Sequence, residues 1–166
     1  MKFSALLLVS LLLLNGCTTD VVKDLRSYLG YDEEALLSLK KGVISQDGDT
    51  KATIQAIYLN NTNNELYENG ENFFIAVYIA DDFDESKNYG LKNSRYRLSL
   101  NGNEAVKVIE LDESSTLRKE MPLKSRWSHY YHVIFNKTDA DELKLTFSYK
   151  NLAKSVLVYQ EELRQK

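Results

Sequence analysis

The chain has 166 residues, of which 43% are hydrophobic and 27% are charged, and this globular composition has the length of one ordinary domain. Its net charge is −3, and removal of residues 1–16 would take away Lys2 alone and leave −4. Such a mildly acidic balance gives no electrostatic reason to expect binding to nucleic acid, which requires a basic face.

Residues 1–16 have the pattern of a signal peptide. Lys2 supplies a positive charge, and the twelve residues from Phe3 to Leu14 are mostly apolar. A charged n-region before an apolar h-region of about 7–15 residues is typical of secretory signals. As a helix, the run would rise about 18 Å and fall short of a hydrocarbon core of roughly 30 Å, which argues against a transmembrane span.

The end of this segment, Leu14-Asn15-Gly16-Cys17, resembles the lipobox of bacterial lipoproteins. The resemblance implies cleavage before Cys17, thioether diacylation of its sulfur and usually a third acyl chain on the new amino group. Two or three chains form a stable membrane anchor, because each buried CH₂ contributes about 0.8 kcal/mol. No Asp follows Cys17 directly, which in the Gram-negative sorting pattern favours the outer membrane. The alternatives are an ordinary secretory signal with an incidental cysteine, or a buried thiol in a cytoplasmic protein.

Residues 17–42 are expected to form the lipidated start, a tether and a short helix or extended segment. Apolar residues between positions 21 and 29 recur at helical spacing, and Gly30 would end that run. A second helix could begin at Asp32 as its cap and end at Lys40-Lys41-Gly42. The same stretch could instead open a first strand, "LLSLKKGVI". Cys17 is the only cysteine, so the domain has no internal disulfide.

From residue 50 the apolar period changes to two, which indicates strands. "FFIAVYIA" is apolar on both faces and predicts a central strand that is covered on both sides. Asn101-Gly102, between alternating runs, predicts a hairpin. Six or seven strands without intervening helices favour an all-β, antiparallel β-sandwich over residues 43–166, with a small barrel as the alternative. The expected strands lie in "TIQAIYLN", "FFIAVYIA", "YRLSLNGNEAVKVIEL", "WSHYYHVIF", "LKLTFSYK" and "SVLVYQ".

The stretch "TKATIQAIYLNN", which leads to "ENFFIAVYIADDF", resembles small bacterial lipoproteins with one variant immunoglobulin-like domain behind a lipid anchor. The resemblance implies an immunoglobulin-like sandwich of about seven strands after a short helical or extended tether. Trp127 is the only tryptophan, and the cysteine–tryptophan–cysteine pattern of true immunoglobulin domains is absent. The resemblance therefore implies an architecture and no functional residues.

The only two histidines, His129 and His132, lie three positions apart in a predicted strand. On a helix this pair could bind one metal ion, but side chains of a strand alternate, so the two should point to opposite faces. We therefore predict no metal site here. The acidic run of Asp81, Asp82, Asp84 and Glu85 is expected to be a solvated loop, with calcium binding as the alternative, since the EF-hand spacing fails at Ser86.

Catalytic signatures are missing from the sequence: it has no Gly-x-Ser-x-Gly elbow, no glycine-rich phosphate loop and no His-Glu-x-x-His motif. We expect a non-enzymatic protein without a cofactor. The remaining feature is the stretch "SRWSHYY", in which Arg126, Trp127 and Tyr130 are residue types that dominate interaction hot spots. They are the predicted contact residues for a partner.

Together these patterns predict a lipoprotein of the bacterial envelope, anchored through Cys17 in the outer membrane. Its domain is expected to act as a non-catalytic binding or assembly module for a protein or glycan partner. Two other functions remain as alternatives: a structural component of an outer-membrane complex, and a small hydrolase that uses carboxylates.

Overall fold

The computed structural model describes residues 33–62, 66–80 and 88–160. The predicted signal peptide, Cys17, the tether as far as residue 32 and the acidic run from Asp81 to Glu85 lie outside the described residues. No helix in the described part of the chain has the length and apolar character needed to cross a bilayer.

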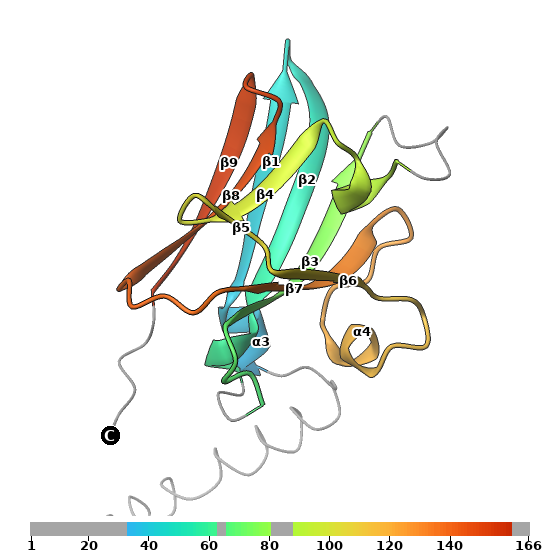
Figure 1. The fold of residues 1–166 in the computed structure, drawn as a ribbon. Helices are drawn as coiled ribbons and strands as arrows, with labels where there is room; N and C mark the ends of the chain where they lie inside the picture. The colour runs from blue at the N-terminus through green and yellow to red at the C-terminus, as the bar shows by residue number, and fades with distance from the viewer. Residues whose placement is uncertain (1–32, 63–65, 81–87, 161–166) are drawn as a thin grey trace, which may run out of the picture. The chain divides into compact units, whose positions relative to one another are not determined.

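Nine strands in the described residues form two antiparallel sheets (Figure 1). The five-stranded sheet has the order β1-β2-β3-β7-β6, and the four-stranded sheet has the order β5-β4-β8-β9. The strands are β1 (Leu39–Gln46), β2 (Asp49–Tyr58), β3 (Glu71–Ile79), β4 (Tyr96–Leu100), β5 (Asn103–Glu104), β6 (Lys107–Glu110), β7 (His129–Phe135), β8 (Glu142–Tyr149) and β9 (Ala153–Gln160). The short helices are α3 (Glu33–Leu37), η1 (Leu59–Asn61), η3 (Gly90–Lys92) and α4 (Thr116–Glu120).

The strand order is that of an immunoglobulin-like sandwich. Strands β2-β3-β7-β6 correspond to the A-B-E-D sheet of such a domain, and β4-β8-β9 correspond to its C-F-G sheet. β1 and the two-residue β5 are additional strands at the sheet edges. The predicted all-β antiparallel sandwich is confirmed, with nine strands where we expected about seven.

The main core fills the space between the two sheets. It is rich in aromatic side chains, and Phe73 alone lies within 6 Å of the rings of Tyr58, Phe135 and Tyr159, measured between ring centroids. The hydroxyl of Tyr159 crosses from β9 to donate a hydrogen bond of 2.7 Å to the carbonyl oxygen of Ala56 on β2. The buried tyrosines thus join the sheets through both their rings and their hydroxyl groups.

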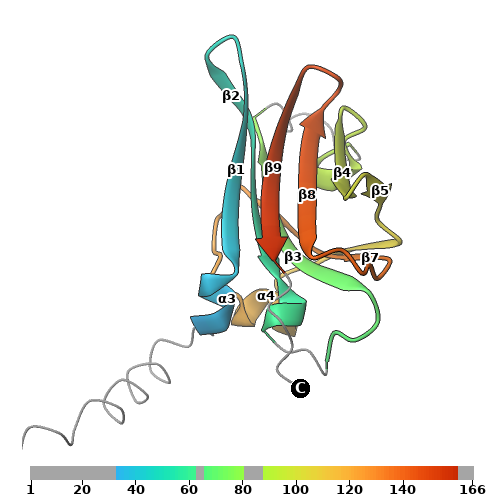
Figure 2. The same ribbon diagram turned by 90° about the vertical axis from the view of Figure 1, so that its left-hand side faces the viewer.

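One edge of the sandwich is closed by β1 and β9, which lie side by side (Figure 2). Gly42 on β1 permits this approach, because a Cβ there would overlap the hydroxyl oxygen of Ser155 on β9. A larger residue at position 42 would require the Ser155 hydroxyl to move and would crowd the side chain of Ile54.

The prediction that "FFIAVYIA" forms a central strand covered on both faces is confirmed. β3 lies in the middle of its sheet, and eight of its nine residues are buried. One face of β3 contributes Phe73, Ile75 and Val77 to the main core. The other face carries Phe74 and Ala76 in a second apolar cluster on the outside of the five-stranded sheet.

The second cluster is covered by α3, which lies where one of the two expected alternatives placed a helix, and by α4 with its flanking residues, which the sequence patterns did not predict. Ala35 of α3 and the residues around α4 pack onto the outer face of the sheet, with Leu111, Met121 and Leu123 all buried there.

The region before residue 46 combines both expected alternatives, a short helix and a first strand, since α3 is followed at once by β1. The sandwich therefore includes Leu39 and begins earlier than the boundary we expected at residue 43.

Candidate functional site

The 18 residues 111–128 leave the sheet at the end of β6 and return at the start of β7, with α4 in between (Figure 1). The start of this excursion is ordered by Asp112, whose Oδ1 accepts hydrogen bonds from the hydroxyl of Ser114 and from the backbone N–H groups of Ser114 and Ser115. The hydrogen bonds from Ser114 are the main cause that lowers the pKa of the Asp112 carboxyl. Ser115 then caps α4, because its side chain accepts from the N–H of Arg118.

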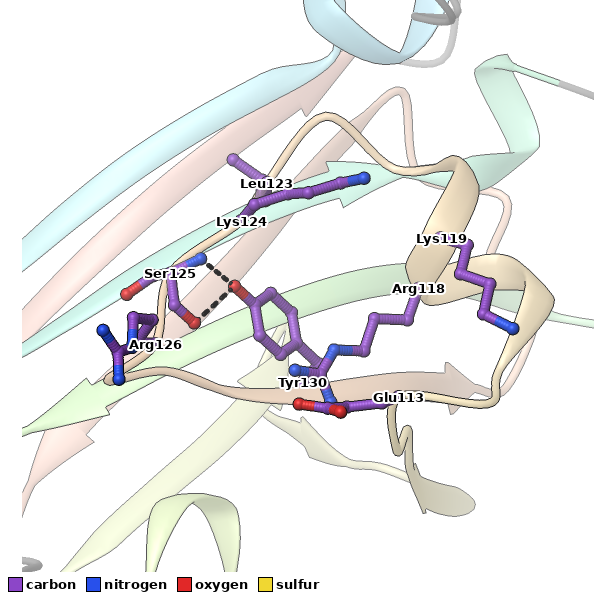
Figure 3. Close-up of a pocket in the computed structure, with 8 residues that line it drawn as sticks. All are labelled: Glu113, Arg118, Lys119, Leu123, Lys124, Ser125, Arg126 and Tyr130. Carbon is purple, nitrogen blue, oxygen red and sulfur yellow. Dashed lines mark hydrogen bonds between the residues drawn. The ribbon is translucent and has the colours of Figure 1, made fainter.

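Tyr130 holds the other end of the excursion in place (Figure 3). Its hydroxyl accepts a hydrogen bond from the N–H of Ser125 and donates one of 3.1 Å to the carbonyl oxygen of Ser125. The guanidinium carbon of Arg118 lies 4.6 Å from the centroid of the Tyr130 ring, and Nη1 of Arg118 donates to the carbonyl of Leu111. One buried tyrosine thus fixes both α4 and the segment before β7.

The three predicted contact residues take different positions. Arg126 and Trp127 are exposed, whereas Tyr130 is 2% exposed. Tyr130 therefore positions the surface from below, and Arg126 and Trp127 are the side chains that face solvent. Among the exposed large apolar residues of the described chain, Trp127 has the largest ring system, at 66% exposure.

A groove of about 470 Å³ lies beside Trp127. Its floor is the outer face of the five-stranded sheet, where Thr53 and Gln55 of β2 and Tyr78 of β3 lie next to one another in register. Lys41 of β1, Ser125 and Ser128 complete the lining. The groove offers hydroxyl, amide and ammonium groups beside two aromatic rings, and its volume falls in the range of about 300–1,000 Å³ that is usual for ligand sites.

A second hollow of about 420 Å³ lies between α4 and residues 123–126 (Figure 3). Among the described residues it is lined by four basic side chains and one acidic side chain, on a chain whose net charge is −3. Ser125 lines both this basic hollow and the groove beside Trp127. Within the described residues, the ion pairs involve none of its basic residues, which are Arg118, Lys119, Lys124 and Arg126.

A third hollow, of about 310 Å³, contains two carboxylates, Glu110 and Asp112. Burial alone would raise the pKa of the Glu110 carboxyl, but hydrogen bonds from Lys92 and Tyr89 outweigh it and hold this pKa below its ordinary value. The pKa of Asp112 is lowered as well. Hydrolysis by two carboxylates needs one with a raised pKa as the proton donor, so this pair lacks the arrangement that such chemistry uses.

The two histidines of β7 face opposite sides of the sheet, as predicted. His129 pairs in register with Val77 of the main core, and His132 pairs with Phe74 of the outer cluster. The ring of His129 packs 4.5 Å from that of Tyr89, measured between centroids. In the described part of the chain, no three His, Cys, Asp or Glu side chains come close enough to hold a metal ion.

His132 belongs to a hydrogen-bonded network under the outer cluster. Its Nε2 lies 2.9 Å from Oδ1 of Asn72, whose Nδ2 donates to the carbonyl oxygens of Tyr67 and Gly70. Because those two contacts fix the orientation of the Asn72 amide, Nε2 of His132 carries the proton that it shares with Oδ1. Burial, aided by the charge of Lys107, lowers the pKa of His132.

This lowered pKa predicts a loss of stability in weak acid. The unfolded chain, with a histidine pKa of 6.5, takes up a proton before the folded chain does, so the free energy of unfolding falls as the pH drops below that value. A His132→Gln variant keeps a donor for Asn72 and should lose less stability between pH 7 and pH 5 than the wild type. Urea unfolding at both pH values measures this difference, with His129→Gln as the control. Equal pH dependence in wild type and His132→Gln would contradict the assignment.

The sequence predicted the exposed pair Arg126 and Trp127, but it did not predict the groove and the basic hollow that adjoin them. The floor residues of the groove lie in predicted strands, where no pattern marks them as a site, and the basic residues of α4 belong to no motif that predicts one. Comparison with models of protein families, with curated proteins and with solved structures finds no match for this chain.

Proposed function

We propose that this protein is a lipid-anchored lipoprotein of the bacterial envelope whose sandwich acts as a non-catalytic binding or assembly module. Cys17 carries the anchor, in the outer membrane. The surface formed by residues 123–128 and the adjoining groove contacts a protein or glycan partner. The anchor proposal rests on the lipobox-like segment Leu14-Asn15-Gly16-Cys17 and on the apolar run that precedes it.

The binding proposal is carried by one observation: an exposed Trp127 stands on a rigid support beside a polar groove. The backbone of Ser125 is held on both sides by the Tyr130 hydroxyl, and the hydroxyl of Ser125 accepts a hydrogen bond of 3.2 Å from the N–H of Trp127. A tryptophan exposed on a fixed backbone binds a partner with little loss of conformational entropy. The pair Glu110 and Asp112 has no carboxyl with a raised pKa, so this pair gives no support to carboxylate-dependent hydrolysis.

The anchor is tested by metabolic labelling with an alkyne analogue of palmitate. The wild-type chain should carry the label, and Cys17→Ser should carry none, because its hydroxyl cannot form the thioether. Thr18→Ser is the matched control, since it changes a neighbouring residue and keeps the sulfur. Label on the Cys17→Ser chain, or no label on the wild type, would overturn the anchor.

The surface is tested by placing a photo-crosslinking amino acid at position 127 or at position 152 in cells. Trp127 and Leu152 are matched in exposure, at 66% and 65%, but Leu152 lies in the turn between β8 and β9. Position 127 should give an adduct of defined mass, protein or glycan, that position 152 does not give. Equal adducts from both positions, or none from position 127, would contradict a specific binding surface at residues 123–128.

A further inference from the structure

We propose that the ligand of this surface is an acidic glycan, with a sugar ring against Trp127 in the groove and an acid group in the neighbouring basic hollow. This inference rests on the proposed binding function and specifies its partner. Its basis is the juxtaposition of two hollows of different chemistry on the two sides of one short, fixed segment.

The groove has the composition of a sugar subsite. A sugar presents many hydroxyl groups and, on one side of its ring, a patch of C–H groups. The C–H patch packs on the electron-rich face of an aromatic ring, which Trp127 and Tyr78 can provide. The hydroxyl groups need donors and acceptors, and the amide of Gln55 with the hydroxyls of Thr53 and Ser128 supplies both.

A protein partner fits this groove less well. Hot spots of protein interfaces are anchor side chains that enter well-packed, fully desolvated pockets on the partner. Among the described residues that line the groove there is no Val, Leu, Ile or Met, and the lining combines polar groups with the two aromatic rings in about equal measure. An apolar peptide side chain buried there would leave the groove's hydroxyl and amide groups without partners, which costs free energy, whereas a polyhydroxylated ring satisfies them.

The basic hollow supplies the preference for an acid group. Arg118 is held by stacking on Tyr130 and by its hydrogen bond to Leu111, so its charge is already in position before a ligand arrives. Lys124 and Arg126 are exposed at the opposite wall (Figure 3). Guanidinium groups suit the planar geometry of carboxylates and the tetrahedral geometry of phosphate or sulfate.

The two hollows adjoin along the chain. Arg126 lines the basic hollow, the next residue, Trp127, lines the groove, and Ser125 lines both. A ligand with repeating sugars and acid groups can therefore occupy the groove and the basic hollow at the same time. The two weak contacts are made by one ligand molecule and reinforce each other. Once its sugar ring is bound in the groove, the effective concentration of its acid group at the basic hollow is raised.

The test uses the full chain, purified in mild detergent, and three probes of equal length: hexagalacturonate, the neutral sugar maltohexaose and the acidic peptide hexaglutamate. We expect hexagalacturonate to bind more tightly than either other probe, and its affinity should fall as the salt concentration rises. Trp127→Ala should weaken hexagalacturonate about tenfold and leave hexaglutamate unchanged, with Leu152→Ala as its control.

The basic hollow is tested separately with the double variant Lys124→Ala/Arg126→Ala. It should weaken hexagalacturonate by roughly tenfold and leave maltohexaose unchanged, whereas Lys137→Ala/Lys154→Ala removes the same charge elsewhere and should have little effect. All six of these side chains, including those of the single variants, are exposed, so thermal unfolding should confirm that each variant folds.

Three results would overturn the inference. Maltohexaose as tight as hexagalacturonate would remove the role of the acid group, and hexaglutamate as tight as hexagalacturonate would remove the role of the sugar. Absence of oligosaccharide binding, together with a persistent crosslink at position 127 in cells, would refute the acidic glycan and leave the proposed binding function intact.

Discussion

Replacing Gly70 by alanine should destabilise the sandwich by about 3 kcal/mol, a large effect for a single methyl group. Gly70 has a φ of +100°, a conformation that costs an L-residue roughly 1–2 kcal/mol. A Cβ at this position would also overlap the carbonyl oxygen of Phe135 at the end of β7. That oxygen belongs to the backbone and cannot rotate away, so β3 and β7 would have to separate where they meet, and overpacking of this kind costs about 1–3 kcal/mol.

Gly48 provides the matched control. Its φ is +87°, and a Cβ built on it meets nothing within 4 Å. Gly48→Ala therefore carries the conformational cost alone and should destabilise by about 1 kcal/mol. Urea unfolding of both variants separates the two causes, since the difference between them measures the overlap with Phe135. Equal losses would show that the backbone at residue 70 yields, and that the overlap carries no cost.

The hairpin turns show why part of this fold is readable from sequence. Asn101-Gly102 was expected to join two strands, and in the structure it connects β4 to β5 with φ values of +48° and +85°. Asp47-Gly48 connects β1 to β2 with +55° and +87°. Positive φ at both central residues is the requirement of a type I′ turn, which few residue pairs satisfy, so the signal is local and specific.

The candidate binding surface could not be predicted from the sequence as the hairpin turns could, because no local sequence pattern defines it. Tyr130 alternates outward on β7 and, from its strand alone, belongs on an exposed face. Its burial results from residues 111–128, which fold over it, and from its register partner Ala76, whose small side chain leaves room for the ring. Tertiary packing thus changes an exposed strand position into the support for Arg126 and Trp127.

The basic hollow also depends on tertiary packing and on no local sequence pattern. The acidic balance of the whole chain led us to expect no binding of nucleic acid, and it says nothing about a local basic hollow. Arg118 reaches that hollow from α4, whereas Lys124 and Arg126 reach it from the segment before β7. Six or eight residues of sequence separate them from Arg118, with no period that relates them. Their proximity to Arg118 depends on the two hydrogen bonds between the Tyr130 hydroxyl and the backbone of Ser125.

The second large loss of stability is expected when the hydrogen bond from Tyr58 to the buried carboxylate of Glu71 is removed. Glu71 at the start of β3 is 4% exposed; its Oε2 accepts a hydrogen bond of 2.5 Å from the hydroxyl of Tyr58, and its Oε1 accepts one of 3.0 Å from the N–H of Thr138. Tyr58→Phe removes a donor to a buried acid, and hydrogen bonds to charged groups contribute about 1.5–3 kcal/mol. We expect a loss of about 2 kcal/mol in the free energy of unfolding.

Tyr159→Phe is the control for this prediction, because Tyr159 is equally buried but donates to the neutral carbonyl oxygen of Ala56. It should cost about 1 kcal/mol, the usual contribution of a neutral hydrogen bond. Glu71→Ala should cost about 3 kcal/mol or more, and adding Tyr58→Phe to it should cost little further, because the interaction is already lost. Two results would contradict this prediction: equal losses in the free energy of unfolding for Tyr58→Phe and Tyr159→Phe, or additive losses for Tyr58→Phe and Glu71→Ala. Either would show that the Tyr58–Glu71 hydrogen bond contributes no more than a neutral one. The predicted order of losses instead makes Glu71 the acceptor that ties β2, β3 and the segment after β7 together at one end of the sandwich.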